Sequence, residues 1–307
     1  MKVFAVVVNW NGGDQNLTCI ASLLAEGLAE SQIVMVDNAS VDGSCEQVVA
    51  RYPAVVLLRN PSNEGYGHGT NRGIEHALAQ GAGAVLLVNN DLVLERGCLG
   101  GLLAGLESDP SLGIAGPRVL LASRPDRVWA AGGTLTFRTN LSRLRGHHCP
   151  DGPEFRRSVE VDYVAGCCLL VRREVLDQIG LLDGSYFAYH EDLDFCLTAK
   201  AAGWGVRCLG EFAALHDAHG STGGGYNPRR KYMMGVNTVW FLKRHGRPLG
   251  WLGFALFDVA PLPLMLLIAP LRGRTRGVLA KALGTWHGLL GRRIRAEQLE
   301  PGGSPLW

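Results

Sequence analysis

The chain has 307 residues and a formal net charge of only +2, which is too small for a strong overall electrostatic attraction to nucleic acid. Its hydrophobic content of 47% is ample for a substantial core. The eight cysteines form no CxxC pair, which disfavours both a clustered zinc site and a small disulfide-stapled secreted domain. The apolar run at the N-terminus stops at Asn9, too early for a signal peptide, and we expect a cytoplasmic protein.

Short apolar runs alternate with amphipathic segments over the first ninety residues. Strands are predicted at 3–8, 32–37, 54–58 and 84–88, with helices between them at 17–28, 43–51 and 71–80. This alternation predicts a parallel sheet with helices on both faces. Such sheets bind ligands beyond the carboxyl ends of their strands, and polar residues stand at three of these ends: Asn9, Asp37 with Asn38, and Asn90 with Asp91.

The pattern is less regular after residue 91. We expect a helix over 92–108, a strand at 119–121 and an irregular or hairpin segment over 124–153. Strand character over 161–171 is followed by a short helix over 173–179, and a longer helix is predicted over 229–245. The sequence shows no internal repeat and no low-complexity linker.

Two features of the first half are candidates for nucleotide binding. Asp37 ends the second strand, where a carboxylate can accept the imide N–H of uracil or thymine; a turn or capping aspartate fits the same local sequence. The stretch from Asn63 to Asn71 has three glycines ahead of a helix, which suits close backbone approach to an anion. It is not a GxxxxGK[ST] loop, which argues against an ATPase or kinase of that class.

Asp91 is a candidate metal ligand. Mg²⁺ and Mn²⁺ prefer oxygen ligands and are commonly held by one or two carboxylates together with substrate phosphates. The alternative for Asp91 is a cap on the following helix. His216, at the end of an apolar run, is either a further metal ligand or a structural histidine, and His219 is expected to be structural.

Three carboxylates, Glu191, Asp192 and Asp194, fall within four positions after an aromatic run. Like charges this close raise one another's pKa, an arrangement that suits a general base. The simpler alternative is that these acids complement the dipole at the start of a helix. The preceding aromatic residues would partly desolvate the acids, which favours a functional role.

Taken in order, these stretches resemble the family-2 inverting glycosyltransferases of the GT-A fold, above all the rhamnosyltransferase-like members. The matching stretches are 8–12, 36–40, 63–71, 89–91, 166–167, 190–194 and 203–204. The resemblance spans about residues 1–245. It implies an α/β GT-A domain over 1–245 with a central, mainly parallel sheet flanked by helices. That domain would have a nucleotide-sugar half (1–91) and an acceptor half (92–245), followed by an apolar and basic helical extension over 246–307.

The resemblance also implies roles for individual residues. Asp37 would contact the pyrimidine base, and Asn9 the nucleoside, with Asn71 nearby. Asp91 would be the metal-binding aspartate of the family's DxD motif, and Asp192 the catalytic base of its ED pair. The remaining residues expected to line the donor site are Asn38, Gly65, Tyr66 and Asn90.

Three positions bear on how this chain would bind the metal and the diphosphate. His216 matches a histidine that some members use as a metal ligand. Asn89 replaces the first aspartate of DxD, so metal binding would rest more heavily on the diphosphate. Val236 stands where such enzymes often have an arginine before an asparagine, which puts a diphosphate contact from that helix in doubt.

The implied activity is inverting transfer from a dTDP- or UDP-sugar, with dTDP-rhamnose as the best candidate and Mg²⁺ or Mn²⁺ as cofactor. The acceptor would be a glycan or lipid-linked saccharide in cell-surface polysaccharide synthesis. A nucleotidyltransferase is one alternative, although it would prefer a more basic triphosphate loop. A non-catalytic nucleotide-binding module is the other, but it would have no use for the acids at 191–194. The sequence predicts no nucleic-acid partner and leaves homo-oligomers open.

The apolar stretch 249–271 is long enough to cross a bilayer, but Asp258 and three prolines disfavour a clean span. Its aromatic residues, followed by Arg272, Arg274 and Arg276, suit a segment lying in the membrane interface over 249–276. We therefore expect the protein at the inner face of the cell membrane. A buried packing helix or an oligomer contact is the alternative.

Overall fold

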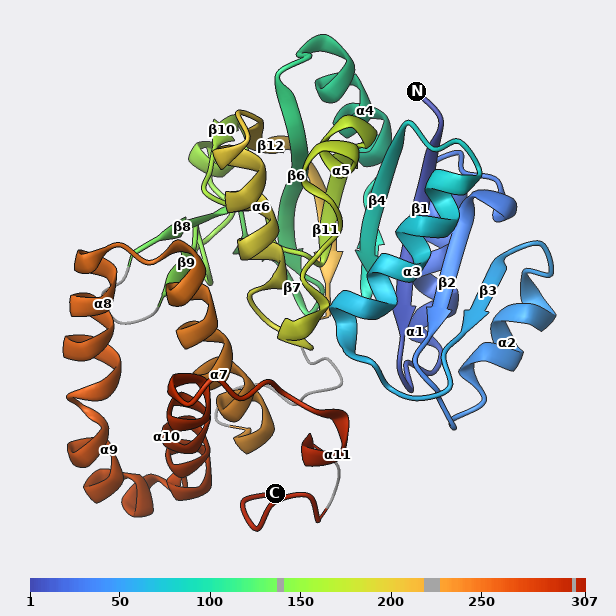
Figure 1. Ribbon diagram of the computed structural model, residues 1–307. Coiled ribbons are helices and arrows are strands. Elements are labelled where there is room, and N and C mark those ends of the chain that lie inside the picture. Colours follow the sequence, from blue (N-terminus) through green and yellow to red (C-terminus); the bar gives the residue numbers. More distant parts are fainter. Residues whose placement is uncertain (137–140, 218–226, 300–301) are drawn as a thin grey trace.

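The computed structural model describes residues 1–136, 141–217, 227–299 and 302–307 (Figure 1). Within these ranges, one mixed sheet carries helices on both faces, and a group of helices from the C-terminal part lies beside it. This is the GT-A fold expected from the sequence. His219, and residues 137–140 of the segment expected to be irregular, lie outside the described ranges.

The N-terminal half has the predicted parallel sheet. Its strands are β1 (Val3–Asn9), β2 (Ile33–Asp37), β3 (Val56–Arg59) and β4 (Ala84–Asn89), in the spatial order β4-β1-β2-β3. Helices α1 (Gln15–Ala25) and α2 (Ser44–Arg51) cover one face, and α3 (Gly65–Ala79) covers the other. Successive side chains alternate between the faces, so Val6 packs in the α3 layer and Val7 in the α1 layer. Burial on both sides explains why β1, β2 and β4 are nearly continuous apolar runs.

The second half adds antiparallel pairings. β11 (Cys168–Arg172) pairs antiparallel with both β4 and β6 (Leu112–Leu121), and β12 (Gly205–His216) runs parallel to β6. The full order is β10-β12-β6-β11-β4-β1-β2-β3, where β10 is Ser158–Glu160. β5 (Leu92–Leu94) pairs with β12, and β7 (Arg124–Ala130) pairs with β6. β8 (Gly133–Leu135) and β9 (Ser142–Leu144) form a separate hairpin.

Two of the elements expected here differ from the structure. The helix predicted over 92–108 is wrong at its start, because β5 precedes α4 (Cys98–Ser108) and Gly97, at φ 82°, separates them. A run of three apolar residues has no periodicity that distinguishes strand from helix. The strand predicted over 161–171 begins only at Cys168, and the twelve-residue β12 was not expected as a strand.

The glycine-rich stretch is not a loop, because α3 already begins at Gly65 and contains Gly67 and Gly69. Gly65 has φ 85°, and a Cβ there would lie 2.5 Å from the carbonyl oxygen of Phe187. A Cβ on Gly67 would lie 2.9 Å from the Cα of Gly184. These glycines therefore let α3 approach the backbone of 184–187, which compensates for their low helix propensity.

The remaining helices follow the sheet strands. α5 (Arg173–Ile179) and α6 (Glu191–Ala201) cover the α3 face, and α7 (Pro228–His245) packs on α6 and, on its other side, on α10 (Thr275–Leu289). α8 (Pro248–Phe254), a π-helical turn (Ala255–Val259), α9 (Leu262–Ile268) and a 3-10 turn (Ala269–Arg272) form the outermost rod in Figure 1. α11 (Ala296–Leu299) follows α10, and 3-10 turns lie at Glu30–Gln32, Pro153–Phe155 and Gly184–Tyr186.

Candidate active site

The polar strand ends meet at one edge of the sheet, where Asn9 pairs in register with Asp37. Asn9 is fully buried, and its Nδ2 reaches three acceptors: Asp37 Oδ1 at 3.1 Å, Ser40 Oγ at 3.0 Å and Ser44 Oγ at 3.0 Å. Its Oδ1 accepts from Asn90 Nδ2 at 3.3 Å. Asn9 thus uses its amide to hold the strand ends together, and a direct contact with a nucleoside stays a prediction.

Asn38 ties the end of β2 to the start of α3. Its Nδ2 donates to the carbonyl oxygen of Gly65 at 3.0 Å, and its Oδ1 accepts from Asn60 Nδ2 at 2.7 Å. Asp37, beside it, is 2% exposed and also accepts from the Ser40 N–H at 3.3 Å. The structure therefore brings Asn9, Asp37, Asn38 and Gly65 together at one edge of the sheet, and binding of a base by these residues stays a prediction.

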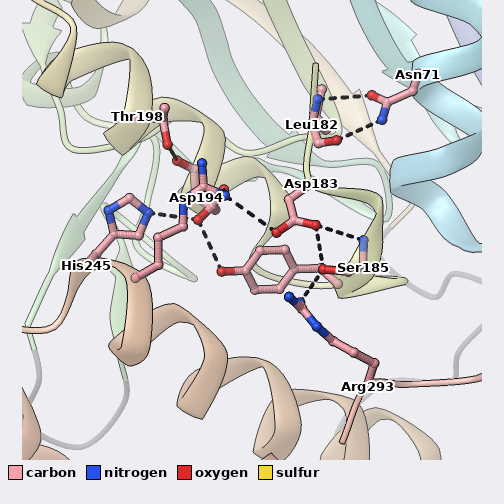
Figure 2. Close-up of polar contacts among 10 residues, drawn as sticks. Asn71, Leu182, Asp183, Ser185, Asp194, Thr198, His245 and Arg293 are labelled. Atoms are coloured by element: carbon pink, nitrogen blue, oxygen red, sulfur yellow. Dashed lines mark hydrogen bonds and ion pairs between the residues drawn. The ribbon is translucent and has the colours of Figure 1, made fainter. Parts of the chain in front are cut away.

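Tyr66 and Asn71, on α3, are both bonded to neighbouring backbone. The Tyr66 hydroxyl donates to the Gly166 carbonyl at 2.8 Å, and burial, followed by the nearby carboxylates, raises its pKa well above the usual value. The Asn71 amide makes two bonds to the backbone of Leu182, at 2.7 Å and 3.0 Å (Figure 2). These contacts join α3 to the acceptor half. They are structural contacts, and binding of the nucleotide sugar by Tyr66 or Asn71 stays a prediction.

Asp91 and His216 are brought together by the pairing of β5 with β12, in which His216 lies opposite Leu92. His216 Nε2 is 3.1 Å from Asp91 Oδ1, and both side chains are less than a tenth exposed. Among the described residues, neither these two atoms nor His216 Nδ1 has a hydrogen-bond partner. The indole of Trp129 packs edge-on against the imidazole, 4.6 Å between centroids.

This pair fits a hard divalent cation. A carboxylate oxygen and an imidazole nitrogen, buried and 3.1 Å apart with no other polar partner among the described residues, are suitable ligands. The described residues contain no group of three or more His, Cys, Asp or Glu side chains placed to hold a metal. Two protein ligands leave several coordination positions for substrate phosphates, which is the usual arrangement for Mg²⁺ at phosphate sites. Asn89, whose backbone N–H donates to the Cys167 carbonyl at 3.0 Å, supplies no second carboxylate.

The two carboxyl groups at the start of α6 have different surroundings. Asp192 Oδ2 accepts from the Gly166 N–H at 2.8 Å, and its Oδ1 accepts from the Leu193 N–H at 2.8 Å. Glu191 is 7% exposed, and its Oε2 has no hydrogen-bond partner among the residues that the structure describes. Burial, followed by the charge of Asp192, raises the pKa of Glu191 to about 8; burial also raises the pKa of Asp192, against the backbone donors.

These different surroundings indicate which of the two carboxyl groups ionises more readily. Backbone N–H groups favour the ionised form of Asp192, and nothing comparable stabilises a charge on Glu191. The backbone donors therefore favour loss of a proton from Asp192 before Glu191. Environments that separate the pKa values of two neighbouring carboxyl groups in this way mark the base of an acid–base site.

The segment that presents these acids has an unusual backbone. Phe187, Tyr189 and His190 all have positive φ, at 63°, 73° and 76°, which costs free energy in non-glycine residues. Asn237, on α7, holds the segment with contacts from its Nδ2 to the carbonyl oxygens of Tyr186, Ala188 and Tyr189 at 2.8–2.9 Å. The helix that lacks the expected arginine at Val236 thus contributes through its asparagine instead.

Asp194 does not join Glu191 and Asp192, and the grouping of all three as catalytic acids is not supported by its contacts. It is 2% exposed, and it lies 2.8 Å from His245 Nε2, 3.1 Å from Arg244 Nη1 and 3.2 Å from the Tyr186 hydroxyl (Figure 2). His245 and Arg244 belong to α7. Asp194 is therefore an ionic link between α6 and α7.

The comparisons with known proteins agree with this architecture. The family model described as glycosyltransferase like family 2 matches residues 2–222. The chain belongs to glycosyltransferase family 2. It is 30% identical over 237 residues to an N-acetylglucosaminyl-diphospho-decaprenol L-rhamnosyltransferase of Mycobacterium tuberculosis, covering 71% of this chain and 76% of that protein.

Two further similarities are more distant, one in sequence and one in structure. The dTDP-rhamnosyl transferase RfbF of Shigella flexneri is 23% identical over 215 residues, covering 70% of this chain and 69% of that protein. The mannosyltransferase PcManGT of Pyrobaculum calidifontis, solved with GDP-Man and Mn²⁺, superposes with a TM-score of 0.59 at 14% identity, covering 94% of this chain and 87% of that one. The relatives make this chain a rhamnosyltransferase-like glycosyltransferase, and the structural match supports its GT-A fold.

Sequence reasoning missed several residues that shape the site. Trp129 lies against His216, and His245 binds Asp194, yet neither residue stands in a recognisable motif. Gly166 was noted only as part of a matching stretch, whereas its N–H and carbonyl bind Asp192 and Tyr66. A glycine between two strand-like runs is the signal that pointed to it, because it marks a close approach of backbone.

Proposed function

We propose that this protein is an inverting, metal-dependent glycosyltransferase that uses a dTDP- or UDP-sugar, with dTDP-rhamnose as the best candidate. Its acceptor would be a lipid-linked saccharide in cell-surface polysaccharide synthesis, at the cytoplasmic face of the membrane. The observation that carries the proposal is the dipeptide Gly166–Cys167, which joins the two halves of the site. Gly166 binds the carboxylate of Asp192, and Cys167 binds Asn89 beside the Asp91–His216 pair.

The chemistry follows from the charge states of these residues. Asp192 accepts the proton of an acceptor hydroxyl while that oxygen attacks the anomeric carbon of the donor sugar. The bond from that carbon to the diphosphate oxygen breaks, and its electron pair leaves with the diphosphate. A single displacement inverts the anomeric centre and needs no covalent intermediate with the protein.

Asp91 and His216 would hold the divalent cation, which when bound supplies positive charge for the diphosphate leaving group. Glu191, kept neutral by burial, avoids a second negative charge beside the base. Asp37, at the buried end of β2, is suited to accept a hydrogen bond from the imide N–H of thymine or uracil. Cytosine and the adenine of ATP have no imide N–H.

Support for the substrates comes from the relatives. The name of the mycobacterial protein specifies rhamnosyl transfer to N-acetylglucosaminyl-diphospho-decaprenol, and that of the Shigella protein specifies dTDP-rhamnosyl transfer. The Pyrobaculum structure contains Mn²⁺ with its nucleotide sugar. A nucleotidyltransferase would instead release pyrophosphate from a nucleoside triphosphate.

Calorimetric titration with dTDP, UDP, GDP and ATP, each with and without Mn²⁺, tests the donor half. We expect Mn²⁺-dependent binding of dTDP or UDP that is lost in Asp91→Ala and retained in Asp126→Ala, which removes an exposed carboxylate on β7. Binding of ATP alone, or no binding of any nucleotide by the folded protein, would refute the proposal. Transfer of the sugar is then followed with the matched nucleotide sugar and a polyprenyl-diphospho-saccharide.

A further inference from the structure

The segment from Pro248 to Arg272, which we call the apolar arm, leaves most of its apolar surface uncovered. The most apolar 18-residue window within it has a mean hydropathy of 2.1, and only 17% of that window is buried. Six leucines account for the most exposed positions, with Leu249 at 79% and Leu271 at 86% exposed; the others are Leu252, Leu256, Leu264 and Leu267. Steps of three and four residues within 249–256 and within 264–271 place these leucines along one side of each half of the rod.

The arm is attached to the protein in a way that does not suit a transmembrane span. Asp258, near its middle, forms an ion pair with Lys281 of α10. Crossing a bilayer would carry this pair and the adjoining part of α10 into hydrocarbon, at a high cost. The π-helical turn at Ala255–Val259, with the prolines at 261 and 263, also divides the arm into two short helices.

The ends of the arm are basic. Arg247 precedes it, and Arg272, Arg274 and Arg276 end and follow it, all exposed. Near the last three lies a cavity of about 510 Å³ whose lining includes Arg229, Thr275 and Arg276. We call the residues Arg229, Arg230, Arg272, Arg274 and Arg276 the basic cluster.

The charges at this end are only partly balanced. The Nε atoms of Arg229 and Arg230 have no hydrogen-bond partner among the described residues. Burial, followed by the neighbouring cations Lys281 and Arg230, lowers the pKa of Lys231 to about 8, with Asp258 as the opposing acid. Excess positive charge of this kind is complementary to a surface of phosphates.

We propose that the apolar arm and the basic cluster together dock this protein on a bilayer that contains anionic phospholipid. The leucines enter the boundary between head groups and acyl chains, while the arginines contact the phosphates. The positive charge of the basic cluster favours an anionic lipid surface as the partner. A second copy of this chain is disfavoured, because the two basic clusters would repel each other. Docking would bring the active site to a lipid-linked acceptor, and to that extent it rests on the proposed function.

Vesicle flotation of the full-length protein tests the docking. We expect binding to vesicles of phosphatidylcholine with phosphatidylglycerol, weaker binding to phosphatidylcholine alone, and loss of the difference at high salt. The triple variant Leu252→Ser/Leu256→Ser/Leu267→Ser should lower the partition coefficient at least about tenfold. Replacing Arg272, Arg274 and Arg276 with glutamine should lower it by up to about fivefold for each arginine on anionic vesicles only.

Matched controls lie on other parts of the surface. Val49→Ser removes an exposed apolar side chain from α2, and Arg51→Gln, Arg96→Gln and Arg157→Gln remove exposed charges. These variants should float like the unmodified protein. Flotation that survives the leucine variant would overturn the proposal, as would resistance of the cellular protein to carbonate extraction, which indicates a span.

Two other results also decide the question. Leucine-dependent self-association in sedimentation, without flotation, would make the arm a contact between copies of this chain. Normal dTDP binding by a protein that does not float would overturn the docking alone. Flotation by a folded protein that binds no nucleotide would leave the docking intact and refute the proposed function.

Discussion

Replacing Glu191 with glutamine tests the charge states of the two carboxyl groups at the start of α6. The folded protein raises the pKa of Glu191 from 4.5 to about 8, so it favours the protonated group relative to the unfolded chain. The stability from this preference is fully present below about pH 4.5 and is lost as the pH rises through about 8. At 1.36 kcal/mol for each pKa unit, the loss amounts to at most about 5 kcal/mol. Glutamine cannot ionise, so the Glu191→Gln variant avoids this loss of stability.

Urea unfolding of both proteins at about pH 5 and about pH 8.5 measures this effect. The unmodified protein should lose several kcal/mol relative to Glu191→Gln between the two values. Burial lowers the pKa of His190 to about 4, which adds stability as the pH rises through about 4 to 6.5, but this contribution is common to both proteins and cancels. Glu75→Gln, at an exposed position on α3, is the control. A stability difference that is the same at both pH values would show that Glu191 is already ionised in the folded protein, and our assignment of Asp192 as the base would lose its electrostatic argument.

Three other substitutions examine the site. Asp192→Asn should abolish sugar transfer and leave the calorimetric affinity for dTDP nearly unchanged; loss of nucleotide binding by the folded variant would remove Asp192 from the role of base. Asn237→Asp should lower the free energy of unfolding by about 2–4 kcal/mol, and more than Asn237→Ala, because a carboxylate would face three carbonyl oxygens; equal thermal stability of the two variants would contradict these contacts. Gly65→Ala should lower the free energy of unfolding by about 1–3 kcal/mol, because Gly65 has a φ of 85° and its added Cβ would meet the Phe187 carbonyl. The control in thermal unfolding is Gly100→Ala, whose Cβ would meet no neighbouring atom. A Gly65→Ala variant as stable as the control would refute the close packing.

The parallel half of the sheet was predictable because three of its four strands, β1, β2 and β4, are buried on both faces. The run from Val3 to Asn9 has apolar residues at every position until its polar end, and the intervening helices show their own period. β5 lacked such a signal, since three apolar residues next to a helix read as part of that helix. β12 was also missed, although it is twelve residues long, because the arginine, cysteine and glycine within it interrupt the alternation.

The candidate site was predictable only in part. Asp91 and His216 are far apart in the chain, and they meet because β5 pairs with β12, a pairing that no local pattern announces. The local sequence offered each residue as a candidate metal ligand, and the resemblance to known enzymes then supported a metal-binding role for both. The glycines from Gly65 onward were interpreted as letting the backbone approach an anion. The close approach that the structure shows is to the backbone of 184–187 in this chain, and these glycines lie within a helix.

The acidic triplet shows how acids that are adjacent in the sequence take different places in the structure. An α-helix turns about 100° for each residue, so Asp192 and Asp194 point to nearly opposite sides of α6. Asp192 accordingly reaches Gly166 beside the strand ends, and Asp194 reaches Arg244 and His245 on α7. Contacts with α7 thus hold one side of α6, while its other side presents Asp192, the proposed base. Because α7 also holds the strained segment before Glu191 through Asn237, the start of the C-terminal helices is a structural part of the active site.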